Sequence, residues 1–197
     1  MLGGHIARHL HEQSEATSVR FHPISRNLEQ HLLYGDIDIA IMSDRGAEHI
    51  GTALESQWLF RDERVVIASA TNPPFRGQLT LETYIAAPHA TFEMHQFDSV
   101  SMSQLWPEIE RPSHQVVSVP HFTALPEIVA NSGCLALIQK RLAMRMASAG
   151  IVTIHPAPFD APSVEIFAYW SPLCSHDPAL NWIVKLLADI SSALPVE

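Results

Sequence analysis

The sequence predicts an α/β protein in which helices and strands alternate along the chain. Segments with apolar residues four apart alternate with short apolar runs, many of them with a period of two. The chain opens helix, strand, helix, strand, which favours a right-handed parallel sheet covered by helices. Its 197 residues, 47% hydrophobic and 17% charged, suffice for one large globular domain or two small ones.

The first elements are expected within residues 2–42. Helices are expected at 2–13 and 27–34, and strands at 17–23 and 37–42. Ser25 occupies a natural N-cap position for the second helix, and Gly35 suits the left-handed residue that ends it. The near-continuous apolar run that follows is typical of a parallel strand with both faces covered. Asp38 inside it must be paired or reach the end of the sheet, because an unpaired buried charge is costly.

The same alternation continues to the end of the chain. Strands are expected at 54–60, 63–70, 88–93, 115–119, 134–138, 151–155 and 164–170, and helices at 81–86, 103–110, 122–131, 140–147 and 179–193. Asp177 and Pro178 are a typical N-cap and first helical residue for the last helix. The proline-rich residues 155–162 are expected to form a linker or crossover.

Charge and composition exclude several classes of protein. A net charge of -9 repels phosphate, so the chain by itself is a poor nucleic-acid binder. No apolar run is long enough to span a bilayer, and no signal peptide opens the sequence. Cys134 and Cys174 are expected to be reduced thiols rather than a disulfide, with Cys134 in the core. A cytoplasmic protein without membrane contact is therefore expected.

The sequence indicates neither an enzyme nor a metalloprotein. It has no nucleophile elbow, no glycine-rich phosphate loop and no His-Glu-x-x-His motif. His5, His9 and His11 suggest a metal cluster, but structural zinc normally takes four ligands, and a solvated helix face is the preferred interpretation. No catalytic residue, metal or cofactor is expected.

Five motifs, in order, resemble one family. They are L-x-x-G-D-I-D-I-A-I at 32–41, L-F-R-D-E-R-V-V-I-A at 59–68, G-Q-L-T-L-E at 77–82, V-P-H-F-T-A-L-P-E-I-V-A at 119–130 and D-P-A-L-N-W-I at 177–183. Together they resemble the effector-binding domain of LysR-type transcriptional regulators. The V-P-H-F segment looks most like the branch that responds to aromatic inducers, such as salicylate-type and flavonoid-type regulators.

The resemblance implies a two-lobed fold like a type 2 periplasmic binding protein, with parallel or mixed sheets around a central cleft. Lobe I would comprise residues 1–61 and 162–197, and lobe II residues 62–161. It also implies that an N-terminal winged helix-turn-helix and the first strand of lobe I lie outside this chain. The parent protein would be a homodimer or higher oligomer that contacts DNA only through that missing domain.

Five candidate ligand-binding residues follow from strand ends and from the resemblance. They are Ser25, Ser43, His95, His121 and Phe122. Four of them have a structural alternative: Ser25 as a helix cap, the two histidines as loop residues, and Phe122 as core, with Phe92 and Phe97 weighed in the same way.

The predicted function is a sensor domain that binds a small aromatic acid between its lobes and controls transcription. A solute-binding protein of the same fold is the alternative. An enzyme is less favoured, because His121 with Ser25 is the only pair that suggests itself and their spacing does not support catalysis.

Overall fold

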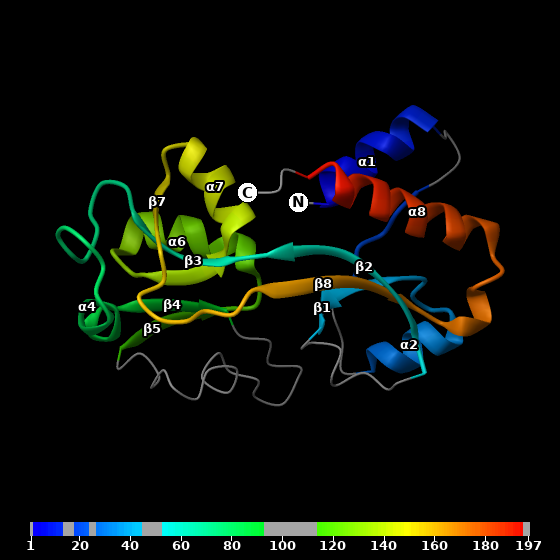
Figure 1. Cartoon of the computed structure of the whole chain (residues 1–197), viewed down its shortest axis with the longest axis horizontal. Helices are drawn as coiled ribbons and strands as arrows, with labels where there is room; N and C mark the ends of the chain where they lie inside the picture. The colour runs from blue at the N-terminus through cyan, green and yellow to red at the C-terminus, as the bar shows by residue number, and fades with distance from the viewer. Residues whose placement is uncertain (1, 14–17, 24–26, 45–52, 93–113, 195–197) are drawn as a thin grey trace. The chain divides into compact units, whose positions relative to one another are not determined.

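The computed structural model of the chain describes residues 2–13, 18–23, 27–44, 53–92 and 114–194. The chain divides into two compact units (Figure 1). Unit 1 comprises Met1–Arg61 and Val164–Glu197, and unit 2 comprises Asp62–Ser163. The chain therefore crosses between units twice. The arrangement of two lobes around a ligand cleft stays a prediction.

Unit 1 is built on a three-stranded sheet. Its elements are α1 (Leu2–Gln13), α2 (Leu28–Tyr34), β1 (Ala40–Ser43), β2 (Glu55–Asp62), β8 (Val164–Trp170), the 3-10 turn η2 (Pro172–Cys174) and α8 (Pro178–Ser192). The strand order is β1-β8-β2. Strand β1 runs antiparallel to β8, with Ala40 opposite Tyr169 and Ser43 opposite Ile166.

Helices cover both faces of this sheet. Helices α1 and α8 lie side by side (Figure 1) and share one apolar cluster with the strands. That cluster contains Leu2, Ile6, Leu10, Leu59, Phe60, Ala168, Leu186, Leu187, Ile190 and Leu194. On the other face, Leu28 and Leu32 of α2 pack with Ala40 and Met42 of β1. The two-sided burial explains why the β1 region reads as an almost continuous apolar run.

Helix placement in unit 1 follows the sequence closely. The expected bounds of α1 are confirmed, and Gly35 ends α2 in the left-handed conformation with φ 78°. Asn27, rather than Ser25, is the N-cap residue of α2; Ser25 lies outside the described residues. Asp177 caps α8 by accepting a hydrogen bond from the Ala179 N–H, as expected.

Three strand expectations in unit 1 are wrong. Residues 18–23 alternate in hydrophobicity but form no strand, and Val19 and Phe21 are 42% and 65% exposed. Strand β1 is antiparallel to β8, not parallel, because β8 returns from unit 2 about 120 residues later and a local pattern cannot encode its direction. Asp38 is exposed and precedes β1, so its charge stays in water.

Unit 2 combines antiparallel and parallel pairing. Its elements are β3 (Arg64–Ser69), α4 (Leu81–Ala86), β4 (His89–Phe92), β5 (Gln115–Val119), η1 (Phe122–Ala124), α6 (Leu125–Ser132), β6 (Ala136–Gln139), α7 (Lys140–Ser148) and β7 (Val152–His155). Strand β3 is antiparallel to both β6 and β7, whereas β4 and β5 are parallel. A parallel bridge from His89 to Leu135 joins β4 to the residue before β6.

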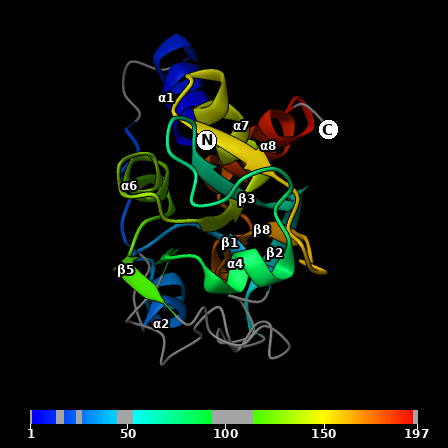
Figure 2. The same cartoon turned by 90° about the vertical axis from the view of Figure 1, so that its left-hand side faces the viewer.

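The β3 strand alternates its side chains between two cores. Val65 and Ile67 face α6 and α7, and Val66 and Ala68 face α4. Figure 2 shows α7 and α4 on opposite sides of β3. Mixed α/β architecture is thus confirmed, and Cys134 is buried in the first of these cores, as expected. Both cysteines are free thiols.

The helix expected at 103–110 lies outside the described residues. Across the described residues, every helix is too short or too polar to span a lipid bilayer.

Candidate ligand-binding site

In unit 2, three strands end at the edge where the chain arrives from unit 1. Strand β3 begins at this edge, and its first residue, Arg64, is opposite Gln139, the last residue of β6. Strands β4 and β5 run parallel to the segment that leads into β6. The carboxyl ends of β4, β5 and β6 therefore point to the same edge, which is where ligands usually bind in α/β proteins.

An aromatic pair occupies this edge. Phe92 ends β4 and Phe122 begins η1, just after β5. Their rings stack with centroids 3.8 Å apart and planes 19° from parallel. Both side chains are half-buried and rest on the core beneath α6 and α7. The pair is thus a fixed apolar surface against which another planar ring could pack.

His121 lies beside this pair with its imidazole exposed. It is the N-cap residue of η1, with extended backbone angles, yet its side chain makes no capping hydrogen bond. Its carbonyl accepts a hydrogen bond from the Ala124 N–H at 3.1 Å. The side chain is therefore available to a ligand. The helical N–H groups that begin here also favour an anion.

In unit 1, the carboxyl ends of β1 and β2 lie at the edge from which the chain leaves. Ser43 ends β1 opposite Ile166, two residues after the start of β8. Glu165 binds two groups of β2 there: its Oε2 accepts a hydrogen bond from Trp58 Nε1 at 2.7 Å, and its Oε1 lies 3.6 Å from Arg61 Nε. Burial, and then the nearby Asp44 carboxylate, raise the pKa of Tyr169 on the same sheet.

The five predicted site residues are therefore distributed as follows. His121 and Phe122 are adjacent at the edge of unit 2, and Ser43 is at the corresponding edge of unit 1. Ser25 and His95 lie outside the described residues. The sequence suggested Phe92 either as a residue that stacks on an aromatic ring or as core, and it was not among the five site residues. Its position at the end of a strand parallel to β5 was the available signal for its pairing with Phe122. Ligand binding by these residues stays a prediction.

The side chains of the N-terminal histidines contact other residues of their own helix, α1. His9 Nδ1 lies 3.0 Å from the His5 carbonyl oxygen, and His5 Nδ1 lies 3.2 Å from an Arg8 guanidinium nitrogen. His5 and His9 are half-buried, so this helix face is less solvated than the sequence suggests. Within the described ranges, no three His, Cys, Asp or Glu side chains are grouped to hold a metal ion.

Comparison with known proteins identifies similar chains. The family model described as the LysR substrate binding domain matches residues 4–191. Nodulation protein D 1 of Sinorhizobium fredii is 24% identical over 181 residues, covering 91% of this chain and 55% of the relative. The HTH-type transcriptional activator NagR of Ralstonia sp is 21% identical over 170 residues, covering 86% of this chain and 56% of the relative. The chain thus spans about half the length of the curated relatives it matches.

Solved structures share the fold. The regulatory domain of MexT, a transcriptional activator in Pseudomonas aeruginosa, superposes with a TM-score of 0.75 at 19% identity, covering 93% of this chain and 88% of that one. The regulatory domain of MetR, a LysR family regulator from N. meningitidis, gives 0.64 at 18% identity, covering 97% and 86%. At these identities the similarity establishes the fold.

Proposed function

Because the chain belongs to the LysR substrate-binding domain family, we propose that it is the effector-binding domain of a LysR-type transcriptional regulator. The family match over residues 4–191 is the observation that carries this proposal. The names of the relatives support it, since they describe regulators rather than enzymes. In the intact protein, a separate domain contacts DNA, and a homodimer or higher oligomer assembles.

The effector is a small aromatic acid. The stacked Phe92 and Phe122 rings offer an apolar surface for its ring, and the exposed His121 imidazole offers a hydrogen bond to its carboxylate or phenol. The N–H groups at the beginning of η1 and α6 favour the negative charge. The V-P-H-F sequence at 119–122, which resembles the aromatic-inducer branch, points to the same ligand class.

The ligand binds between the two lobes, with Ser43, Ser25 and His95 completing the site. A ligand that touches both lobes favours one closure angle over others. It shifts the population of that state only by its differential affinity for the two states, and the shift is passed to the DNA-binding domain.

Isothermal titration calorimetry tests the ligand class. We expect salicylate and benzoate to bind, benzamide to bind more weakly because it lacks the charge, and cyclohexanecarboxylate to bind more weakly because it lacks the planar ring. Replacing His121 by Ala removes one hydrogen bond and leaves a ligand atom unsatisfied, which weakens binding by about 1–3 kcal/mol, or roughly 5- to 150-fold.

A matched control separates this effect from a general loss of histidine. His114 is exposed at the other end of β5, so His114→Ala should leave the affinity unchanged. Absence of binding by every aromatic acid, or an unchanged affinity in His121→Ala, contradicts the assignment of this surface.

A further inference from the structure

One ionisable side chain is buried at the boundary between the units. Asp62 is the first residue of unit 2 and is only 5% exposed, whereas the preceding Arg61 side chain is 66% exposed. Both belong to β2, in which successive side chains point to opposite faces. The strand thus turns a carboxylate inward at the point where the chain enters unit 2.

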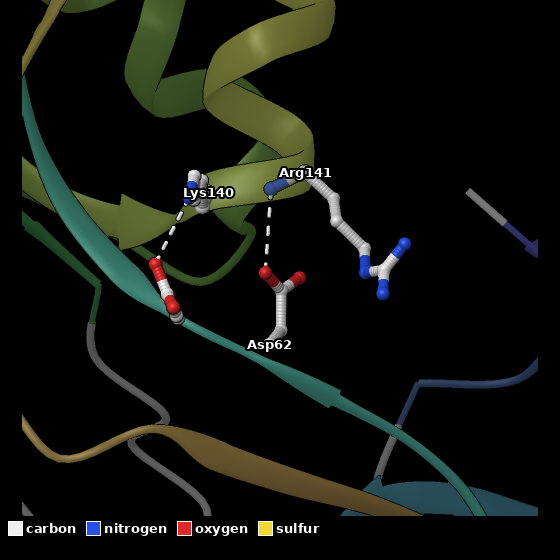
Figure 3. A network of polar contacts seen from close by, with 4 residues as sticks. Asp62, Lys140 and Arg141 are labelled. Carbon is white, nitrogen blue, oxygen red and sulfur yellow. Dashed lines mark hydrogen bonds and ion pairs between the residues drawn. The ribbon is translucent and has the colours of Figure 1, made fainter. Parts of the chain in front are cut away.

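Asp62 meets the N-terminus of α7. Its Oδ1 accepts a hydrogen bond from the backbone N–H of Arg141 at 3.3 Å (Figure 3). The helix's own N-cap residue, Gln139, makes no side-chain capping bond. A residue 79 positions away therefore supplies the acceptor that normally comes from the cap, at the end of the helix dipole that favours a negative charge.

A second contact between the entering chain and α7 lies beside the first. The Lys140 N–H donates to the Glu63 carbonyl at 2.8 Å, and Lys140 Nζ lies 3.0 Å from Glu63 Oε2. Two consecutive residues of the entering chain are thus fastened to the first two residues of α7. The Glu63 side chain is well exposed, so its ion pair is screened by water and the buried contact of Asp62 is the firmer of the two.

The last residues before the boundary are fastened to unit 1 instead. Glu165 of β8 pairs with Arg61 at 3.6 Å and accepts the Trp58 hydrogen bond at 2.7 Å. Side-chain anchoring therefore changes from unit 1 to unit 2 within one peptide bond. The Arg61–Asp62 peptide thus lies between the side-chain contacts made to unit 1 and those made to unit 2.

Opposing influences act on the Asp62 carboxyl group. Burial raises the pKa of Asp62, and the nearby Glu63 charge acts in the same direction, while the Arg141 N–H and the Arg141 charge oppose them. A neutral acceptor such as asparagine could accept the same hydrogen bond without losing hydration of a charge.

We propose that Asp62 is a positioning residue that anchors the first crossing to the N-terminus of α7, so that rotation of one unit against the other bends the chain at the Arg61–Asp62 peptide. The inference depends on the division into two units and on the contacts at their boundary. It does not depend on the identity of the ligand.

Electron paramagnetic resonance distance measurements on the ligand-free chain test the anchor. One spin label is attached at Lys185→Cys on α8 and one at Glu82→Cys on α4, both exposed positions, with Cys174→Ser removing the accessible thiol. We expect Asp62→Ala to broaden the distance distribution between the units. Asp62→Asn keeps an acceptor oxygen and should retain the parent distribution. Glu63→Gln, the matched control, breaks only the exposed pair and should do the same.

A double variant separates anchoring from helix stability. In Asp62→Ala, amide exchange in the first turn of α7 should accelerate about fivefold, the factor expected for loss of one helix cap. Adding Gln139→Asp supplies a cap from the helix itself and should restore slow exchange while the distribution stays broad. If the double variant also recovers the narrow distribution, or if Asp62→Ala never broadens it, the anchor is refuted.

Discussion

The two units share an architecture but place their ionisable groups differently. Each contains a three-stranded sheet with helices on both faces. Among the described residues, the buried charged or titratable side chains Asp62, Tyr84 and His89 all belong to unit 2, whereas the buried polar side chains of unit 1 are Ser171 and Ser191. Two carboxylates of unit 1, Glu165 and Glu55, instead accept hydrogen bonds from indole N–H groups at its surface. Unit 2 should therefore respond to pH, and unit 1 much less.

Substitutions in the two separate apolar cores should have the largest effects on stability. Ile67 is fully buried in unit 2, and Leu187 is 1% exposed in unit 1. Truncating either to Ala removes methyl groups and leaves a cavity, which should cost about 2–5 kcal/mol of unfolding free energy. Because the cores are distinct, we expect Ile67→Ala to destabilise unit 2 and Leu187→Ala to destabilise unit 1.

Urea unfolding can follow the stability of the two units separately. Trp58, Trp170 and Trp182 lie in unit 1, so after Trp106→Phe the fluorescence reports on that unit, while circular dichroism reports on both. Ile67→Ala should lower the urea midpoint of the circular-dichroism transition of unit 2. The midpoint of the fluorescence transition, which reports on unit 1, should stay unchanged. Coincident shifts of both signals in both variants would show instead that the chain unfolds as one cooperative unit.

The local periodicity of the sequence predicted several helices and strands well. The helix bounds 2–13 and 81–86 and the strand bounds 115–119 and 164–170 agree with the structure residue for residue. Their apolar spacing is a property of the segment itself, and both faces of each sheet are covered by helices, which makes the pattern strong. The direction of β1 was missed because its partner strand comes more than a hundred residues later.

The candidate site was predicted only in part. The V-P-H-F motif located His121 and Phe122 at a strand-to-helix junction. The stacking of Phe122 on Phe92 depends on a parallel register between β4 and β5 that no short motif encodes. The contact of Asp62 with Arg141 was likewise missed, because it joins residues 79 apart and neither residue type is unusual at its position.

A smaller effect should come from His89, in the core of unit 2. His89 is 1% exposed, its Nε2 lies 2.6 Å from the Tyr84 carbonyl oxygen, and its ring packs against the Tyr84 ring. Burial lowers the pKa of His89, and only the Tyr84 carbonyl partly opposes this. The folded state therefore prefers neutral imidazole. That stabilisation is complete above the ordinary value of about 6.5 and is lost as the pH falls through the lowered pKa.

Unit 2 should thus lose stability in mild acid while unit 1 does not. Burial also lowers the pKa of His155, which adds to the trend. His89→Gln, which keeps a donor for the carbonyl but does not titrate, should flatten the pH dependence, at a loss of about 1–3 kcal/mol at neutral pH if its geometry is poorer. Exposed His176→Gln in unit 1 is the control. The test is the urea midpoint, followed by circular dichroism, as a function of pH. If the midpoint of His89→Gln falls with pH as steeply as that of the parent protein, His89 is not the cause of the pH dependence.

The smallest effect should come from the surface carboxylate of unit 1. Glu165 contacts Trp58 and Arg61, but the Arg61 and Trp58 side chains are more than half exposed, so water and salt compete with both contacts. Glu165→Gln keeps an acceptor for the indole N–H and loses the charge, so we expect a change of about 0–1 kcal/mol in the fluorescence-detected unfolding of unit 1. About 1 M NaCl should reduce the difference between the two proteins further, because salt screens exposed charges. A loss above about 2 kcal/mol that persists in salt would mean that this carboxylate is held as tightly as the buried groups of unit 2, and the contrast between the units would fail.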